Sequence, residues 1–181
     1  MSSWQTLALL PLAVLVASPT YATEYLTVEQ AQKAIFPDAD RFVAAPLQLS
    51  AQQKAAIEDK SGVKQRWDKQ EVWRAEKGGK LLGWFIVDDV VGKHEFIHYA
   101  VGLLPEGKVR GVEVLIFRET YGDEIHRAEW RKTFVGKTLA DPFKLDKDVP
   151  NISGATLSCR NVMHGVKRLL ALQQVALQEG K

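Results

Sequence analysis

The residues with the clearest capacity for chemistry stand together just before the last amphipathic segment, in the order Ser153, Gly154, Ala155 and Thr156. Pro150 disfavours helical backbone in the residue before it, so the chain reaches this segment in an extended form. Where a helix then begins, unpaired backbone N–H groups and the positive end of the helix dipole favour an anion, phosphate above all. Gly154 allows close approach of the backbone, and Ala155 keeps the site small. The segment therefore predicts a phosphate site, with an ordinary Ser or Thr N-cap as the alternative.

The same residues, preceded by Asp148 and followed by Leu157 and Ser158, resemble the flavinylation motif of the FMN-binding domain family. That family includes the periplasmic flavoprotein subunits of sodium-pumping quinone reductase and of Rnf-type ferredoxin oxidoreductase. Its members take FMN through a phosphoester bond on the last Thr of the motif, delivered from FAD by a magnesium-dependent flavin transferase. The similarity spans roughly residues 84–171 and includes the segments 111–114, 118–125 and 134–137.

The resemblance implies a role for each residue that matches the motif. Thr156 would carry FMN covalently through its hydroxyl, and Asp148 lies where the family has an acidic residue recognised by the transferase. Other residues implied to contact the cofactor near Thr156 are Ser153, Gly154, Ala155, Leu157 and Ser158. Candidates for contacts with the flavin or its ribityl chain, as opposed to ordinary surface residues, are Glu119, Tyr121 and Lys137.

The N-terminal segment 1–22 reads as a secretory signal peptide. It contains no Asp, Glu, Lys or Arg, its apolar stretch covers residues 7–17, and Thr20 and Ala22 are small residues at the −3 and −1 positions. The stretch is short and interrupted by prolines, which does not suit a membrane-spanning helix. We expect cleavage after Ala22 and export to the periplasm or beyond, with an uncleaved anchor and membrane association as the alternative.

Composition sets further limits on function. The formal net charge of +2 is too small to indicate nucleic acid as a partner. Cys159 is the only cysteine, so no disulfide forms within the chain. What remains after the leader suits one domain, which we divide into an N-terminal helical and extended segment at residues 23–80 and an FMN-binding domain at residues 81–176.

Periodicity predicts an α+β fold, an antiparallel meander of strands bracketed by helices as in FMN-binding domains. Short helices are expected after Thr27, ending before Pro37, and after Ser50, ending toward Gly62. The connections between the expected strands are too short for parallel crossovers. Strands are expected at residues 71–76, 81–90, 95–103 and 108–118, and later helices at residues 125–135 and 157–175.

Three functions are compatible with these residues. The leading hypothesis is an exported electron carrier with covalent FMN, serving a membrane or periplasmic redox partner, since the cofactor supplies the redox chemistry. The alternatives are a non-redox assembly or binding subunit of a membrane-associated complex, and a hydrolase using Ser153 or Thr156, for which no His and Asp set is evident. His94 and His98 share a strand face without a third metal ligand, and Cys159 and His164 lie about 140° apart on a helix, so they form no nucleophile–base pair.

Overall fold

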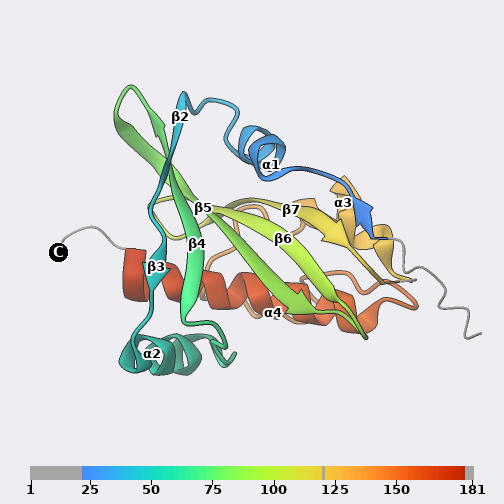
Figure 1. Cartoon of the computed structure of the whole chain (residues 1–181). Coiled ribbons are helices and arrows are strands. Elements are labelled where there is room, and N and C mark those ends of the chain that lie inside the picture. The colour runs from blue at the N-terminus through green and yellow to red at the C-terminus, as the bar shows by residue number, and fades with distance from the viewer. Residues whose placement is uncertain (1–21, 120, 178–181) are drawn as a thin grey trace, which may run out of the picture.

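The structure is a computed structural model that describes residues 22–119 and 121–177. Its centre is a curled antiparallel sheet in the order β1-β7-β6-β5-β4-β2, with β3 paired to β4 (Figure 1). Every strand pair is antiparallel, which confirms the predicted α+β class. The strands are β1 (Thr23–Glu24), β2 (Arg41–Ala44), β3 (Leu47–Gln48), β4 (Lys69–Lys77), β5 (Lys80–Val91), β6 (Phe96–Leu103) and β7 (Val109–Phe117).

The two N-terminal helices begin where local capping dictates. The side chain of Thr27 accepts a hydrogen bond from the Gln30 N–H, and the side chain of Gln30 accepts one from the Thr27 N–H, so α1 starts with a capping box. Ser50 starts α2 in the same way, and α2 ends at Gly62, whose φ of 70° is favourable for glycine. The helical elements are α1 (Val28–Ile35), α2 (Ala51–Ser61), η1 (Asp123–His126), α3 (Ala128–Lys132), α4 (Thr156–Leu172) and η2 (Gln173–Leu177).

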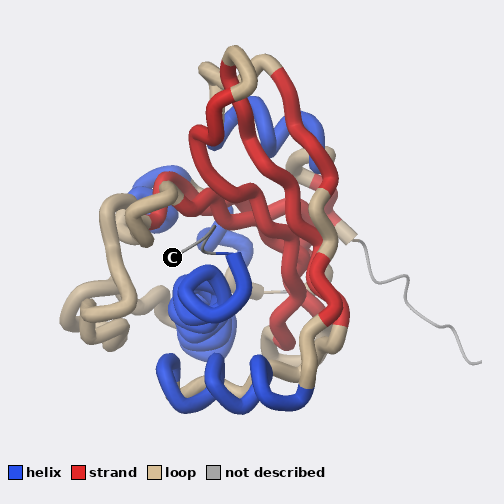
Figure 2. The backbone as a smooth tube through the Cα atoms, turned by 90° about the vertical axis from the view of Figure 1, so that its left-hand side faces the viewer, coloured by secondary structure: helices blue, strands red, loops and turns tan. Residues whose placement is uncertain are grey.

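Helices cover both faces of the sheet (Figure 2), in agreement with the predicted meander bracketed by helices. Trp84 and Ile86 of β5 face the core that contains α4, whereas Phe85 and Val87 face the smaller core that contains α1. This alternation follows from the two-residue period of a strand. The long helix α4 therefore lies along one face, with its N-terminal end on the same side of the molecule as β1 (Figure 1).

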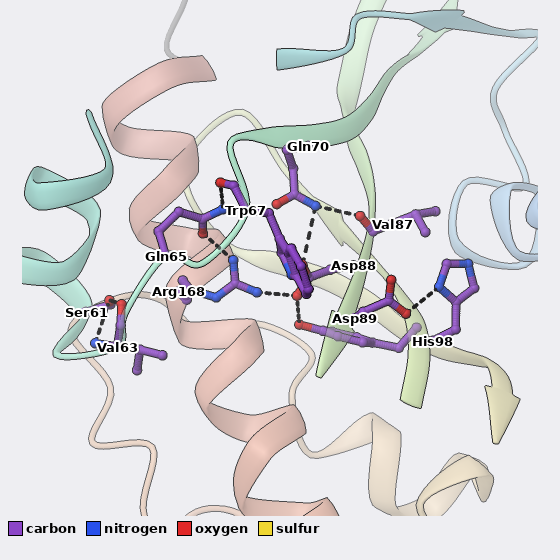
Figure 3. A network of polar contacts seen from close by, with 11 residues as sticks. Ser61, Val63, Gln65, Trp67, Gln70, Val87, Asp88, Asp89, His98 and Arg168 are labelled. Carbon is purple, nitrogen blue, oxygen red and sulfur yellow. Dashed lines mark hydrogen bonds and ion pairs between the residues drawn. The ribbon is translucent and has the colours of Figure 1, made fainter. Parts of the chain in front are cut away.

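A buried polar network fixes α4 to the sheet (Figure 3). Arg168 of α4 donates to Asp88 of β5 and to Gln65, which precedes β4. The Tyr99 hydroxyl of β6 donates to the same aspartate at 2.5 Å. Burial raises the pKa of Asp88, while the neighbouring Arg168 and the bond from Tyr99 act in the opposite direction. Gly165 lets the helix lie against Tyr99, because a Cβ there would overlap the phenol oxygen.

Two details of the predicted elements differ from the structure. The helix expected at residues 125–135 is instead η1 and α3, separated by Arg127 in extended conformation with ψ of 137°. Three short strands were not predicted, because β1, β2 and β3 have no clear alternation and form through pairing with β7 or β4. The predicted boundary between residues 80 and 81 falls inside the hairpin of β4 and β5, and the division into two segments stays a prediction.

Candidate functional site

The start of α4 leaves backbone N–H groups without a partner in the helical ladder. Ala155 is the N-cap, with φ −118° and ψ 17°, and no side chain caps the helix. The first helical hydrogen bond runs from the Cys159 N–H to the Ala155 carbonyl at 2.9 Å, so the N–H groups of residues 156–158 precede the helical ladder. The alternative of a Ser or Thr cap is therefore wrong for this structure. Thr156 is the first helical residue, and its hydroxyl accepts no capping bond.

A pocket of about 410 Å³ opens at this helix start. Its wall includes Thr156, which is half-buried, and the exposed side chains of Leu157 and Tyr121, which are 43% and 77% accessible. Residues predicted to contact the cofactor that line it are Glu119, Tyr121, Gly154, Ala155, Thr156, Leu157 and Ser158. The fold thus brings together two segments that are well separated in sequence, the end of β7 and the start of α4.

The back of the pocket depends on a close contact between these two segments. A Cβ added to Gly122 would lie 2.5 Å from the Ala155 Cβ, and Gly122 has a φ of 92°. A glycine therefore suits this position for two reasons, its backbone conformation and the space it leaves. Gly154 has a φ of 82°, and a Cβ added there would meet nothing within 4 Å, so the pocket side of the loop is open.

Glu119 is held by the turn between β5 and β6. Its Oε1 accepts hydrogen bonds from the backbone N–H groups of His94 at 2.5 Å and Glu95 at 2.9 Å. Burial raises the pKa of Glu119, but the N–H groups of Glu95, His94 and Lys93 outweigh it, and the net shift is downward. The carboxylate therefore stays ionised beside Thr156.

Three of the predicted site residues do not line the pocket. Ser153 is exposed. The Nζ of Lys137 lies 3.0 Å from Oδ2 of Asp148, and that carboxylate also accepts bonds from the backbone N–H groups of Phe143 and Lys144. Lys137 is thus bound to Asp148 in the loop before α4. The sequence predicted a flavin contact for Lys137 and recognition by the transferase for Asp148.

The Asp148 contacts predict a dependence of stability on pH. Burial raises its pKa, but the N–H groups of Lys144 and Phe143 and the ammonium of Lys137 outweigh that effect and lower it. A carboxyl whose folded-state pKa is depressed stabilises the protein above its unfolded pKa, about 3.9, and loses that contribution as the pH falls through the folded pKa. We expect Asp148→Asn to lower the free energy of unfolding by roughly 1–3 kcal/mol at pH 7 and to flatten its decline below about pH 5.

Urea unfolding of the two proteins from pH 7 to pH 3 measures this effect. Asp146→Asn is the matched control, because Asp146 is an exposed acid in the same loop with a φ of 60°, which asparagine tolerates. Equal pH profiles for wild type and Asp148→Asn would contradict a stabilising role for this contact.

Two pocket residues were not assigned to the site from the sequence. Lys93 and His94 line the pocket and are both exposed. Both lie in the connection expected between the strands at residues 81–90 and 95–103, and His94 was considered only as a metal ligand. The local sequence around a basic side chain in a turn does not indicate which residues it faces, because the register of β6 on β7 determines them.

The other candidate chemistry has structural explanations. Nδ1 of His98 lies 2.8 Å from Oδ1 of Asp89, whereas the His94 backbone bonds Glu119, so the two histidines have different partners. Cys159 is fully buried, and burial raises the pKa of its thiol. Within residues 22–119 and 121–177, no cluster of His, Cys, Asp or Glu is arranged to hold a metal ion.

Comparisons with known proteins found a family match, a related sequence and a similar fold. Residues 92–171 match the family described as FMN-binding domain. The chain is 33% identical over 114 residues to a subunit of the ion-translocating oxidoreductase complex of Stutzerimonas stutzeri, covering 57% of this chain and 50% of the relative, so it spans about half the length of that protein. The crystal structure of Shewanella oneidensis NqrC is similar in fold, with a TM-score of 0.54, 19% identity, and coverage of 80% of this chain and 88% of that one.

The likeness to NqrC is one of fold, and the matched region, residues 92–171, defines the class of this part of the chain as an FMN-binding domain. Residues 92–171 belong to the FMN-binding domain family, which confirms the resemblance inferred from the motif. The site suits this cofactor. The open N–H groups at the start of α4 and the side chains of Lys93 and His94 can receive a phosphate, and the pocket beside them has apolar surface for a ring.

Proposed function

We propose that this chain is an exported electron carrier whose FMN is attached to Thr156 through a phosphoester. The observation that carries the proposal is the position of Thr156. It is the first residue of α4, its hydroxyl is not used for capping, and it lines a pocket that adjoins unpaired backbone N–H groups. A phosphate on this hydroxyl would lie at the positive end of the longest helix.

The attachment balances with FAD as the donor. The Thr156 Oγ forms a bond to the phosphorus of the FMN half, the pyrophosphate P–O bond of FAD breaks, AMP leaves, and the hydroxyl proton is released. Among the described residues, the pocket of Thr156 holds one acid, Glu119, and its carboxylate is bound to a backbone turn. This arrangement supports the view that a separate flavin transferase supplies the catalytic groups.

In the loaded site, FMN and the chain have separate roles. When bound, FMN supplies the exchange of one or two electrons. The chain keeps the cofactor from diffusing away through the ester, and Tyr121 at the rim offers an exposed ring against which the flavin can pack. The prediction that Lys137 contacts the flavin is the weaker part of the site, because its ammonium is paired with Asp148.

The redox partner is proposed to be part of a membrane-associated complex. The Stutzerimonas relative is named as a subunit of an ion-translocating oxidoreductase complex, and 33% identity supports a similar setting for this chain. The helices that the structure describes include none long and apolar enough to cross a membrane. Residues 1–21 of the proposed signal peptide lie outside the described residues, so export rests on the sequence alone.

Co-expression with a flavin transferase tests the proposal. The purified chain is expected to be yellow and fluorescent in a denaturing gel, with a mass about 0.44 kDa above the polypeptide, the size of one FMN residue. Protein recovered from the exported fraction is expected to begin at Thr23. An unmodified chain after co-expression would overturn the carrier proposal, and the non-redox assembly or binding subunit would take its place.

Cys159 provides a second, independent prediction about the linkage. It lies three residues after Thr156 but is fully buried, so it cannot be the attachment point. We expect Cys159→Ser to retain the full amount of covalent FMN by intact mass, with a loss of about 1–3 kcal/mol in the free energy of unfolding because a hydroxyl replaces a buried thiol. Loss of covalent FMN from folded Cys159→Ser protein would mean that the linkage is misassigned.

A further inference from the structure

Glu119 is the acid in the pocket of Thr156, and backbone N–H groups stabilise its negative charge. Among the described residues it is the one carboxylate that lines the pocket. The backbone N–H groups of Lys93, His94 and Glu95 act on it and lower its pKa. Successive N–H groups that converge in a turn form a concavity that binds anions, and here the anion is a side chain of the same protein.

The turn at residues 92–95 is fixed from two sides. Glu119, just beyond β7, holds it from one side through the N–H groups of His94 and Glu95. Asn161 of α4 holds it from the other side, because its Nδ2 donates to the Val91 carbonyl at 2.6 Å. The carboxylate fits closely, since a Cβ on Gly92 would lie 2.6 Å from the Glu119 Oε1.

This arrangement decides where the pocket's basic side chains lie. Lys93 and His94 are the central residues of the turn, both are exposed, and both line the pocket with Thr156. The His94 N–H is bound to Glu119, and this contact joins the turn to the segment after β7 that also lines the pocket. Removing the carboxylate would leave Asn161 bound at Val91 but would loosen the backbone at His94 and Glu95.

We propose that Glu119 is a positioning residue, which holds the turn at residues 92–95 so that Lys93 and His94 receive the phosphate at Thr156. The inference rests on the proposed function, because the phosphate is that of FMN. It differs from the sequence-based prediction that Glu119 itself contacts the flavin. In this arrangement the acid acts through the turn, and the two basic side chains meet the cofactor.

A positioning role and a direct flavin contact predict different results when Glu119→Gln is combined with substitutions of Lys93 and His94. If Glu119 acts through Lys93 and His94, Glu119→Gln slows FMN attachment about tenfold in the wild-type chain, because a neutral amide oxygen accepts the bonds from the turn more weakly than a carboxylate does. In a Lys93→Gln/His94→Gln background, the same change has no further effect on the rate. If Glu119 contacts the flavin directly, the loss is the same in both backgrounds.

The experiment measures the initial rate of attachment to purified, unmodified chain. Flavin transferase, FAD and Mg²⁺ are added, and the modified fraction is followed by intact mass. Gly92→Ala is included because it displaces the carboxylate without changing Glu119, and it is expected to slow attachment as Glu119→Gln does. Glu106→Gln and Lys108→Gln are the matched controls, since both are exposed residues beyond the opposite end of β6.

A second measurement does not depend on the cofactor. Backbone amides of residues 93–95 are expected to exchange with deuterium at least about tenfold faster in Glu119→Gln than in wild type, because their acceptor is weakened. Unchanged exchange, or an attachment rate that Glu119→Gln does not alter, overturns this inference alone. Equal losses in the two backgrounds also overturn it, in favour of direct contact. A wild-type chain that takes no FMN overturns the proposed function and the phosphate role together.

Discussion

Thr156→Ala is expected to abolish covalent FMN while leaving the chain folded. Alanine has no hydroxyl, so no phosphoester can form at this position. The cost to stability is expected to be small, below about 1 kcal/mol, because the Thr156 hydroxyl caps no helix and the residue is half-buried. Intact mass after co-expression with the flavin transferase would show the bare polypeptide, and a denaturing gel would show no fluorescent band.

Two further variants make this result specific. Thr156→Ser keeps a hydroxyl on the same backbone and is expected to be modified in part. Ser153→Ala removes the neighbouring hydroxyl, which lies outside the pocket, and is expected to be modified fully. Covalent FMN on folded Thr156→Ala protein would show that another residue is the attachment point, and the proposed site would then be wrong.

Arg168→Met is expected to be strongly destabilising, because it leaves the carboxylate of Asp88 buried without its cation. Both partners are almost completely inaccessible, with side-chain exposures of 5% for Arg168 and 0% for Asp88. Removing one partner of a buried ion pair costs about 3–5 kcal/mol. That loss is a large share of the roughly 5–15 kcal/mol by which domains are stable, and urea unfolding measures it.

The pH dependence of this loss identifies its cause. Burial raises the pKa of Asp88, and loss of Arg168 removes the cation that opposes this shift. A carboxyl with a raised folded-state pKa destabilises the folded protein increasingly as the pH rises from the unfolded value, about 3.9, through the folded value. The deficit of Arg168→Met should therefore be smallest in acid and grow toward neutral pH.

Two controls complete the experiment. Arg160→Met removes an exposed arginine from the same helix and is expected to change stability by less than about 0.5 kcal/mol. Arg168→Met with Asp88→Asn leaves no buried charge and is expected to recover part of the loss, because Tyr99 still has an acceptor. A deficit for Arg168→Met that is below about 1 kcal/mol, or that does not change with pH, would contradict this interpretation.

The arrangement of the network links stability to the site. Arg168, Asp88 and Tyr99 fix α4 against β5 and β6. The same helix carries Thr156 at its first residue, and its Asn161 donates to the Val91 carbonyl next to the turn that faces the pocket. A change in how α4 packs would therefore also move the proposed attachment residue relative to Lys93 and His94.

Local features of the sequence determined most of the elements and the centre of the site. Thr27 and Ser50 start helices because their partners are only three residues away, in contacts that any short stretch of chain can form. The long strands follow from alternation and glycine turns. The family resemblance of residues 153–158 pointed to Thr156 in the same way, since it depends on neighbours in the chain.

Only the tertiary structure decided which distant residues meet. Glu119 bonds His94 across 25 residues, Arg168 bonds Asp88 across 80, and Lys137 bonds Asp148 where the sequence suggested a flavin contact for one and a recognition role for the other. An acid or a base in a loop has the same local pattern whatever it faces. Its partner depends on strand register and on the packing of α4 against the sheet, because a shift of one residue in register turns each side chain to the opposite face.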